Sequence, residues 1–398
     1  MRRVCLVTPG HLSSDPRLVK EAAALAAEGY EVFVQFTQLV NYLRAHDEAI
    51  LRENPAFKPV CLDWTARGLL PRFRRMSGKL VQMVSGRDEY WLNRHYRRQL
   101  RRAVRLDAGL YIGHNLGALP VVVEAAKRTG ARCGFDAEDL HRYETSGDEK
   151  DERVRRKMNL EDRYLPRLDY LTASSPEIAE AYGRLYPGLD PVTVRNVFPV
   201  AQEIAPPAVR AEGPVRLFWF SQTVGLNRGL QDILQALQIT EKGGFELHLL
   251  GNCADHVRSA LLASAGSPVF FYPPVPAAAL PAFAAQFDIG LALEPGFSPN
   301  NEIALSNKLF TYLQSGLALV VSDTRAQQNF LSAYPAAGRL YAKGDAAGLA
   351  AILDHYAQDK GLLQQARMSA FGLARNELNW ENEQRIFLGT VSRTLEKV

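Results

Sequence analysis

Two segments in the second half of the sequence combine residues that suit the binding of a phosphate group. The first is Ser221–Leu230, a small loop containing Gly225 and Arg228 that follows the apolar run 215–220. Backbone N–H groups at the start of a helix can face an anion, and an arginine adds a fixed positive charge. The pattern therefore predicts an anion site, although an ordinary loop with a surface arginine would look the same.

The second segment runs from Glu294 to Lys308 and follows the apolar run 288–293. Ser306 is a suitable N-cap, and Lys308 falls in the first helical turn, where the helix dipole disfavours a cation. A lysine is explained there if an anion is shared between its side chain and the helix N-terminus. The alternative is a lysine that extends into solvent. Glu302 in the same loop can accept hydrogen bonds from a pair of hydroxyl groups, such as those of a ribose.

Common motifs for dinucleotides, nucleoside triphosphates and metals are absent from the sequence. The first candidate βα turn, Thr8–Asp15, lacks the pattern GxGxxG, and the pattern GxxxxGK[ST] occurs nowhere in the chain. The four cysteines stand far apart without a CxxC pair, which indicates reduced thiols rather than disulfides or a zinc site. We therefore expect no metal and no cofactor.

Short apolar runs alternate with helical patterns along the chain. Val4–Val7 is typical of a buried strand, and Asp15 and Pro16 then provide an N-cap and a proline at the first helical position. This alternation predicts parallel sheets with helices on both faces, and ligands at the C-terminal ends of the strands. Further strands are predicted at 32–34, 110–112, 132–136, 170–173, 192–195, 215–220, 245–250, 268–272, 288–293 and 317–321, with helices at 118–129 and 176–186 and over the last 50 residues.

Length and composition predict two globular domains. At roughly 100–200 residues per domain, the 398 residues correspond to two, and 47% hydrophobic residues are enough for two cores. The stretch 198–214 contains four prolines and no periodic pattern, which is typical of a linker. We therefore expect an N-terminal domain at 1–198, a linker at 199–214, a C-terminal domain at 215–378, and a helix at 379–398 that packs back toward the N-terminal domain.

Five segments in a fixed order carry a family resemblance. They are Pro16–Val32, Gly113–Pro120, Phe135–Leu140, Asn307–Asp323 and Asn379–Glu381. The fourth is similar to the stretch NKLFEYLAAGLPVVASD, and the set resembles the GT-B glycosyltransferases, in particular the retaining group called glycosyltransferase family four. The resemblance implies two doubly wound, Rossmann-like α/β domains that face each other across a cleft. It implies an N-terminal domain for the acceptor and a C-terminal domain for the nucleotide sugar.

The resemblance also implies roles for individual residues. His114 matches the histidine that lies beside the donor sugar in relatives, where a neutral imidazole can hydrogen-bond a hydroxyl group. With Glu302 it is our candidate for the catalytic residues. The expected contacts to the donor diphosphate are Arg228, Lys308, Gln222, Gly225, Ser306 and Asn307; those to the donor sugar or nucleotide are Asn301, Glu294 and Thr311; and those to the acceptor are Gly10, His11, Arg17, Asn115, Asp136, Glu138 and Asp139.

The chain departs from the family pattern at several positions. Many relatives carry a Glu-x7-Glu motif whose second glutamate stands where this chain has Thr311, and Gln222 stands in place of a usual arginine. Glu294 and Glu302 have the same spacing but lie in the preceding loop, which we interpret as coincidence. Arg228, Lys308 and two helix N-termini would neutralise the leaving phosphate without a metal. In a retaining transfer, that phosphate can itself take the acceptor's proton.

Residues 67–105 form a strongly basic segment. They include 12 lysines and arginines but only two acids, so this segment carries about +10 and the rest of the chain −6. Apolar residues at helical spacing predict two amphipathic helices: Met76, Leu80 and Val84, then Leu92, Tyr96, Leu100 and Val104. The segment is interpreted as solvated helix faces, as a surface for anionic lipid headgroups, or as a site for an anionic acceptor such as a polyprenyl diphosphate or an acidic glycan. Nucleic acid is not expected, because the total charge is only +4 and no binding motif is present.

The resemblance implies a glycosyltransferase that moves a sugar from a UDP- or GDP-sugar to a glycan or lipid-linked acceptor, in polysaccharide or glycolipid assembly. No apolar run reaches about 18 residues, and the one after Met1 is too short for a signal peptide. A cytoplasmic protein is therefore expected, with the inner face of the membrane as an alternative location. The alternative functions are a GT-B-fold nucleotide-sugar epimerase and a catalytically silent binding subunit.

Overall fold

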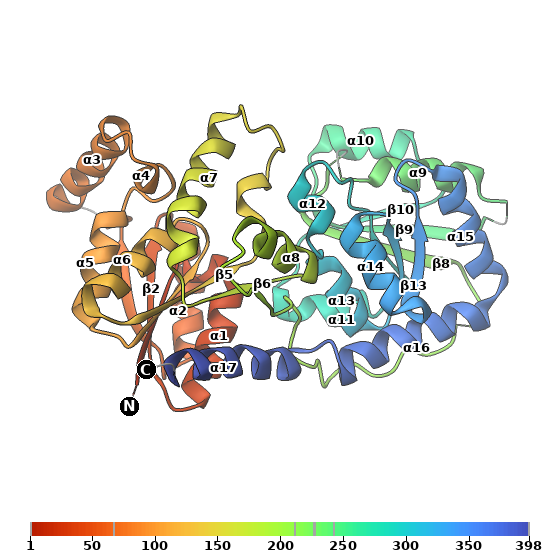
Figure 1. Ribbon diagram of the computed structural model, residues 1–398. Coiled ribbons are helices and arrows are strands. Elements are labelled where there is room, and N and C mark those ends of the chain that lie inside the picture. The colour runs from red at the N-terminus through yellow and green to blue at the C-terminus, as the bar shows by residue number, and fades with distance from the viewer. Residues whose placement is uncertain (1, 67, 211, 226–227, 242, 397–398) are drawn as a thin grey trace. The chain divides into compact units, whose positions relative to one another are not determined.

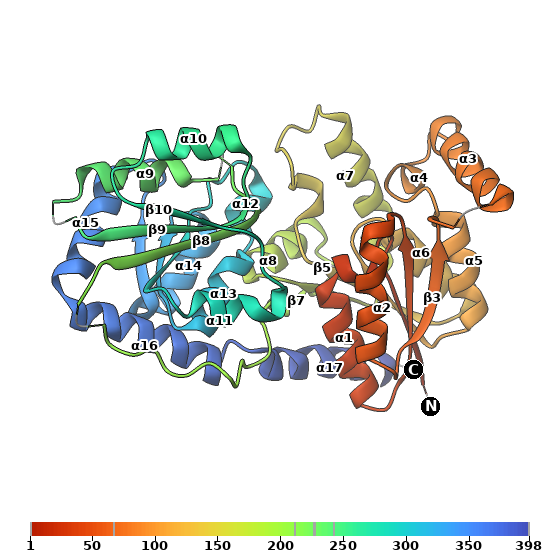
Figure 2. The ribbon, with the colours of Figure 1, turned by 180° about the vertical axis from the view of Figure 1, so that it is seen from behind.

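A computed structural model describes residues 2–66, 68–210, 212–225, 228–241 and 243–396 of the chain (Figures 1 and 2). The chain divides into two compact units: unit 1 comprises Met1–Arg195 with Gln384–Val398, and unit 2 comprises Asn196–Glu383. The stretch 199–214, predicted as a linker, belongs to unit 2. Among the described helices, none combines the length and the apolar character needed to cross a bilayer.

Unit 1 is built on a seven-stranded parallel sheet in the order β3-β2-β1-β4-β5-β6-β7. Its strands are β1 (Arg3–Val7), β2 (Glu31–Gln38), β3 (Lys58–Asp63), β4 (Leu110–His114), β5 (Arg132–Ala137), β6 (Tyr170–Ala173) and β7 (Val192–Thr193). Its helices are α1 (Pro16–Ala27), α2 (Arg44–Glu53), α3 (Leu69–Val84), α4 (Asp88–Leu92), α5 (Tyr96–Leu106), α6 (Leu119–Thr129), α7 (Glu152–Tyr164) and α8 (Pro176–Leu185). Helices α5 and α6 lie on one face of the sheet and α1 lies on the other (Figures 1 and 2).

Unit 2 is built on a six-stranded parallel sheet in the order β10-β9-β8-β11-β12-β13. Its strands are β8 (Val215–Thr223), β9 (Phe245–Asn252), β10 (Val269–Tyr272), β11 (Ile289–Ala292), β12 (Ala318–Ser322) and β13 (Gly338–Tyr341). Its helices are α9 (Leu230–Ile239), α10 (Asp255–Ala263), α11 (Leu280–Ala284), α12 (Pro299–Ile303), α13 (Asn307–Ser315), α14 (Arg325–Ala333), α15 (Ala346–Gln358) and α16 (Lys360–Asn376), and α17 (Trp380–Glu396) returns to unit 1.

Two separate apolar cores cover the two faces of the sheet in unit 2. Alternate residues of one strand serve both: Leu217 and Trp219 of β8 pack with α9 and α15, and Phe218 packs with α11, α13 and α14. All three are fully buried. A strand that is buried on both faces has a continuous apolar sequence, and this is why β8, β11 and β12 were predictable from their sequence.

Two strands are not among those predicted from the sequence, and both lie at the edge of a sheet. β3 has only Leu62 buried along its length, and β13 has its two middle residues half-buried. An edge strand has a partner on one side only, so its residues do not need the apolar run that marks a central strand. The predicted helical character of the last 50 residues is confirmed by α15, α16 and α17.

Candidate functional site

In unit 2 the strand order reverses between β8 and β11. In open parallel sheets, ligands bind outside the carboxyl ends of the strands at such a switch point. The two segments that the sequence analysis selected follow these two strands, since β8 ends at Thr223 and β11 ends at Ala292. The topology therefore brings Arg228 and Lys308 to the same edge of the sheet.

The two loops are in direct contact where helix α9 begins. Gly229 has a φ of +76°, and a Cβ atom added there would lie 2.2 Å from the carbonyl oxygen of Leu293, the residue before Glu294. Arg228 next to it is exposed, as is Gln222, whose carbonyl accepts a hydrogen bond from Asn252 at 3.2 Å. Gly225 is half-buried with open space beside its Cα. Leu226 and Asn227 of this loop lie outside the described residues.

Gly229→Ala is expected to lower the free energy of unfolding of unit 2 by about 3 kcal/mol. The new methyl group would meet the Leu293 carbonyl, and its backbone would have to keep a left-handed conformation that alanine disfavours. Urea unfolding measures the loss. Gly225→Ala, in the same loop but with open space around it, should change stability by less than about 0.5 kcal/mol. Equal effects of the two substitutions would contradict the close approach.

Lys308 binds a carboxylate of its own chain. Its Nζ atom lies 2.7 Å from Oε1 of Glu294, and both side chains are 14% exposed. Nζ also lies 3.4 Å from the Ser306 hydroxyl and 5.8 Å from the centroid of the Trp219 ring. Burial raises the pKa of Glu294, but the Lys308 ammonium outweighs it and holds this pKa below its usual value. The alternative that Lys308 extends into solvent is therefore wrong in this structure.

The residues around Lys308 differ in part from their predicted roles. Ser306 occupies the N-cap position of α13, but its hydroxyl caps no backbone N–H group. Asn307 is exposed at the first position of the helix. Thr311 is 1% exposed and donates a hydrogen bond to the Asn307 carbonyl at 3.2 Å. Thr311 thus faces the interior of unit 2 and has no open side toward a sugar or nucleotide.

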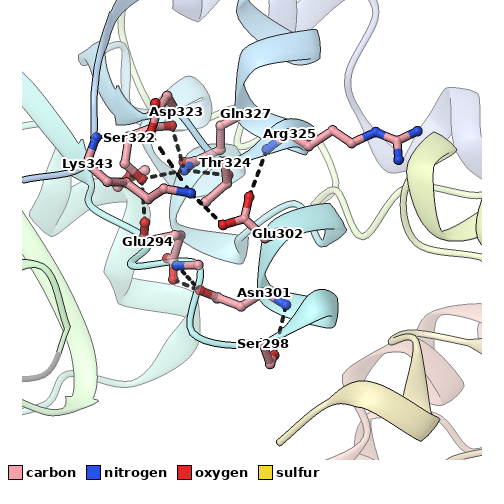
Figure 3. A network of polar contacts seen from close by, with 12 residues as sticks. Glu294, Ser298, Asn301, Glu302, Ser322, Asp323, Thr324, Arg325, Gln327 and Lys343 are labelled. Atoms are coloured by element: carbon pink, nitrogen blue, oxygen red, sulfur yellow. Dashed lines mark hydrogen bonds and ion pairs between the residues drawn. The ribbon is translucent and has the colours of Figure 1, made fainter. Parts of the chain in front are cut away.

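Asn301 holds the loop that follows β11. Its side-chain oxygen accepts from the N–H of Gly296 at 2.7 Å, and its side-chain nitrogen lies 3.4 Å from Glu294 (Figure 3). Its own N–H donates to the hydroxyl of Ser298, the N-cap of α12, at 3.2 Å. The side chain of Asn301 is therefore engaged in shaping the loop that positions Glu294.

Glu302 pairs with a lysine that the sequence analysis did not select. Its Oε1 atom lies 2.5 Å from Nζ of Lys343, which follows β13 and also lies 3.9 Å from Asp323 (Figure 3). The other oxygen of Glu302 accepts from the N–H of Arg325 at 3.4 Å. A Cβ atom at Gly296 would fall 1.9 Å from Oε1 of Glu302, so the Glu302 side chain would have to move if another residue stood there. Lys343 was missed because the strand before it was missed.

In unit 1 the strand order reverses between β1 and β4. The register of the neighbouring strands places His114, Asp136 and Thr172 side by side. Arg17, in the first turn of α1, donates from Nε and Nη2 to the two carboxylate oxygens of Asp136, each at 2.6 Å. Arg17 is 2% exposed and Asp136 1%. These two predicted acceptor contacts form a buried ion pair, and their role toward an acceptor stays a prediction.

His114 lies among three carboxylates beneath the surface of unit 1. It is 2% exposed; Nε2 is 3.1 Å from Glu21, and Nδ1 is 3.5 Å from Asp136 and 3.8 Å from Asp15. Burial lowers the pKa of His114, but the neighbouring Glu21 and Asp15 outweigh it and raise the pKa to about 9. The environment thus favours a charged imidazolium, whereas the resemblance implies a neutral imidazole.

The stability that His114 contributes should fall as the pH rises. Its pKa is raised from 6.5 to about 9 on folding, so the contribution is complete below pH 6.5 and is lost as the pH passes through 9. The difference in unfolding free energy between the wild type and His114→Gln is therefore expected to narrow over this range. Urea unfolding at a series of pH values measures this difference. A constant difference would mean that His114 is not the charged group of this cluster.

Three other predicted acceptor residues stabilise the loops that follow β1 and β4. His11 is 3% exposed; Nδ1 lies 2.7 Å from Asp47, and Nε2 accepts from the N–H groups of residues 39 and 40. Neither ring nitrogen is available to an acceptor in this structure. Asn115 is exposed, has a φ of +64°, and donates to Asp15 at 3.0 Å. The carbonyl of Gly10 accepts from Thr37 at 2.8 Å.

Two partly buried ionisable groups accompany the ion pair of Arg17. Burial raises the pKa of Glu138 to about 7, and burial with the nearby Arg17 lowers the pKa of Lys20 to about 7. Both groups can therefore exchange a proton near neutral pH. Asp139 follows Glu138, and its carbonyl accepts from Tyr182 at 3.2 Å.

Two clusters in unit 1 have the composition of metal sites. Glu21, His114 and Asp136 have donor atoms within 4.8 Å of one another, but Arg17 already neutralises Asp136 there. In the second cluster, Asp139, His141 and Glu144, the carboxylate of Glu144 is bound by His141 and Lys157. Both clusters are thus balanced by cations of the chain.

Solved structures with similar folds match almost the whole chain. HepE of Anabaena in complex with UDP has a TM-score of 0.70 at 13% identity, with 99% of this chain and 100% of that chain covered. Sucrose-phosphate synthase from Thermosynechococcus elongatus has a TM-score of 0.68 at 14% identity, with 99% of each chain covered. A putative UDP-N-acetylglucosamine 2-epimerase from Listeria monocytogenes has a TM-score of 0.60 at 12% identity, with 100% and 97% covered. No family model and no curated protein matches the sequence.

The chain has the GT-B fold. Its two Rossmann-like units, with seven and six parallel strands, correspond over 99% of the chain to the fold of the UDP-bound HepE structure. The predicted fold class of two doubly wound α/β units is thereby confirmed. The candidate donor site is the switch point of unit 2, with Arg228, Glu294 and Lys308. The candidate acceptor site is the switch point of unit 1, with Asn115 and Glu138.

Proposed function

We propose that the chain is a hexosyltransferase that transfers a sugar from a UDP- or GDP-sugar to a glycan or lipid-linked acceptor. The observation that carries the proposal is the meeting of the two loops of unit 2 at Gly229 and Leu293. Arg228 precedes Gly229, and Lys308 binds Glu294, the residue after Leu293, so both cations belong to the switch point of one sheet. The structural neighbours solved with UDP support a nucleotide sugar as the co-substrate.

The arrangement suits departure of a nucleoside diphosphate. Negative charge grows on the phosphate as the bond to the sugar breaks, and fixed donors aimed at that charge lower the barrier. Arg228 is exposed at the start of α9, and Lys308 lies at the start of α13, so each cation is joined to a helix N-terminus. We propose that these groups supply the charge that other transferases obtain from a metal. The resemblance to family four favours retention of the anomeric configuration.

Within this proposal Glu294 controls the position of Lys308. The carboxylate is held by Lys308 and Asn301, and its pKa is depressed, so it is charged at neutral pH. A diphosphate that approaches Lys308 would share the ammonium group with Glu294. Glu302, bound to Lys343, is the candidate for contact with the sugar hydroxyls.

Titration of the chain with UDP, GDP and ADP tests the donor site. Binding of UDP or GDP with a dissociation constant in the micromolar to millimolar range is expected, and uridine or guanosine without phosphates should bind at least about tenfold more weakly. Failure of all three diphosphates to bind would overturn the assignment. The nucleotide that binds identifies the donor class for the turnover assay.

A nucleotide-sugar epimerase is the second candidate, and the Listeria neighbour is the observation that favours it. An epimerase converts its substrate without an acceptor, whereas a transferase releases nucleoside diphosphate at a rate that depends on the acceptor. Incubation of the chain with the identified nucleotide sugar alone distinguishes them. A new nucleotide sugar formed without an acceptor would replace the proposed transferase by an epimerase.

A further inference from the structure

Helix α3 exposes a continuous row of large apolar side chains. Phe73, Met76, Leu80, Met83 and Val84 are between 61% and 82% exposed. They recur every three or four residues, so they occupy one side of the helix over three turns. In both views α3 lies at the edge of unit 1, next to α4 and α5 (Figures 1 and 2).

The opposite side of α3 is fixed to unit 1. A Cβ atom at Gly78 would lie 2.7 Å from the ring of Trp64, so the helix approaches this ring closely. Gly78 is two residues from both Met76 and Leu80, which is about 200° around the helix. Gln82 donates to the carbonyl of Trp91 at 3.1 Å. The packing of α3 thus directs its apolar row into solvent.

Helix α5 presents arginines on the Trp64 side of α3. A cavity of about 570 Å³ is lined by Trp64 and four of them, and a second of about 230 Å³ lies between Trp64, Gly78 and the same helix. The arginines that line the two cavities are Arg94, Arg97, Arg98, Arg101, Arg102 and Arg105. Asp63, the acid that lines the first cavity, is engaged by Arg44 and Thr65.

Three of these arginines have no acidic partner among the described residues. In the part of the chain that the structure describes, Arg97, Arg101 and Arg105 form no ion pair, and all three are exposed. Guanidinium groups held close together in this way repel one another, and an external anion relieves the repulsion. Arginine forks bind phosphate oxygens in pairs, so phosphate groups suit these cavities.

We propose that α3 and the arginines of α5 form a surface that docks on an anionic lipid bilayer. An amphipathic helix lies with its apolar face about 5–10 Å below the headgroups, and an α-helix with its side chains is about 10 Å across. With the row of Phe73 to Val84 inserted, groups on the Trp64 side of α3 come to the level of the lipid phosphates. The arginines of α5 then bind these phosphates. Docking does not depend on the proposed transferase activity.

The first test uses the full chain and vesicles of phosphatidylcholine, with and without phosphatidylglycerol. Sedimentation is expected only with the anionic lipid and should weaken as the salt concentration rises. Leu80→Gln combined with Met83→Gln should lower the partition coefficient at least about tenfold, because two inserted apolar groups are lost. Ile239→Gln combined with Leu262→Gln, at exposed apolar positions of unit 2, is the matched control and should bind like the wild type.

The second test separates the arginines from the apolar row. Arg101→Gln combined with Arg105→Gln should lower binding about 30-fold, at about one kcal/mol for each charge near the surface. Arg153→Gln combined with Arg155→Gln, exposed on α7, removes the same charge and should have a smaller effect. Thermal unfolding verifies that each variant is folded. The proposal would be overturned if the wild-type protein did not bind anionic vesicles. It would also be overturned if the Leu80/Met83 and Arg101/Arg105 double variants bound them as well as the wild type. Binding of a soluble acidic polysaccharide at this surface, without binding of the vesicles, would also overturn the proposal. That outcome would make the surface an acceptor site.

Discussion

Arg17→Met is expected to lower the free energy of unfolding of unit 1 by about 3–5 kcal/mol. Arg17 and Asp136 join through two hydrogen bonds of 2.6 Å, and their side chains are 3% and 1% exposed. A third hydrogen bond, of 3.0 Å, joins Arg17 to the carbonyl of Val194. Methionine fills a similar space but removes both guanidinium hydrogen bonds from the buried carboxylate of Asp136, which keeps only the His114 ring, 3.5 Å away, as a neighbouring cation. Urea unfolding followed by circular dichroism measures the loss.

The matched control is the pair of Arg132 and Asp169, which has the same chemistry at the surface. Their side chains are 40% and 24% exposed and lie 2.8 Å apart. Arg132→Met should therefore cost less than about 1 kcal/mol. A second variant, Asp136→Asn added to Arg17→Met, removes the orphaned charge and should recover part of the loss. If Arg17→Met and Arg132→Met lower the free energy of unfolding equally, burial does not determine how much the Arg17–Asp136 pair contributes to stability.

The loss in Arg17→Met should also depend on pH. Burial raises the pKa of Asp136, but Arg17 outweighs it and holds this pKa below 3.8 in the wild type. The ion pair therefore stabilises the fold at any pH above the pKa of Asp136 in the unfolded protein. This stabilisation is lost as the pH falls through the pKa of Asp136 in the folded protein. Without Arg17, Asp136 protonates more readily. The difference in unfolding free energy between the wild type and Arg17→Met should be smaller near about pH 4 than near about pH 7.

The sequence predicted the parts of the fold that have strong local signals. Central strands such as β8 are apolar throughout because both their faces are covered, and Asp15 with Pro16 marks the start of α1, where Asp15 accepts from the N–H of Leu18 at 3.2 Å. The two loops of the candidate donor site were also found, because each follows such a strand. Their contact at Gly229 depends on the strand order, which no local pattern contains.

The parts that could not be predicted depend on long-range packing. His114 was expected as a neutral imidazole beside a donor sugar, but the register of β4 with β5 places it beside Asp136 and under α1, where Glu21 lies next to it. Lys343 was not considered because it follows an edge strand with a weak signal. In both cases the missing information is which residues of other elements lie within a few ångströms.

The basic segment shows why spacing alone does not give burial. Leu80 of α3 and Leu100 of α5 have the same helical spacing to their neighbours, and both helices are rich in arginine. Leu100 is 3% exposed, because its face packs on unit 1, whereas Leu80 is 61% exposed. The difference arises because α3 uses its Gly78 side for packing. Amphipathic patterns predict which face is apolar, and the tertiary structure decides whether that face is covered.

Lys308→Met is expected to lower kcat of the proposed transfer by about 10²–10³-fold, the usual effect of removing one fixed donor to a developing charge. Lys308 lies at the start of α13, and its ammonium group is 2.7 Å from Glu294. Glu294 belongs to the loop after β11, which contacts the loop that contains Arg228. Loss of its charge leaves the departing phosphate with one cation fewer. The affinity for UDP or GDP should fall as well, while the affinity for the nucleoside alone should not change.

The substitution also leaves the largely buried Glu294 without its cation, so its structural effect must be separated from its effect on the reaction. Adding Glu294→Gln removes the orphaned charge and should restore the free energy of unfolding. If Lys308 stabilises the leaving phosphate, the double variant regains stability but not kcat. Lys360→Met, at the start of α16 in the same unit, should leave both unchanged. Full activity and unchanged diphosphate affinity in Lys308→Met would place the phosphate site elsewhere, and recovery of kcat in the double variant would reduce Lys308 to a structural partner of Glu294.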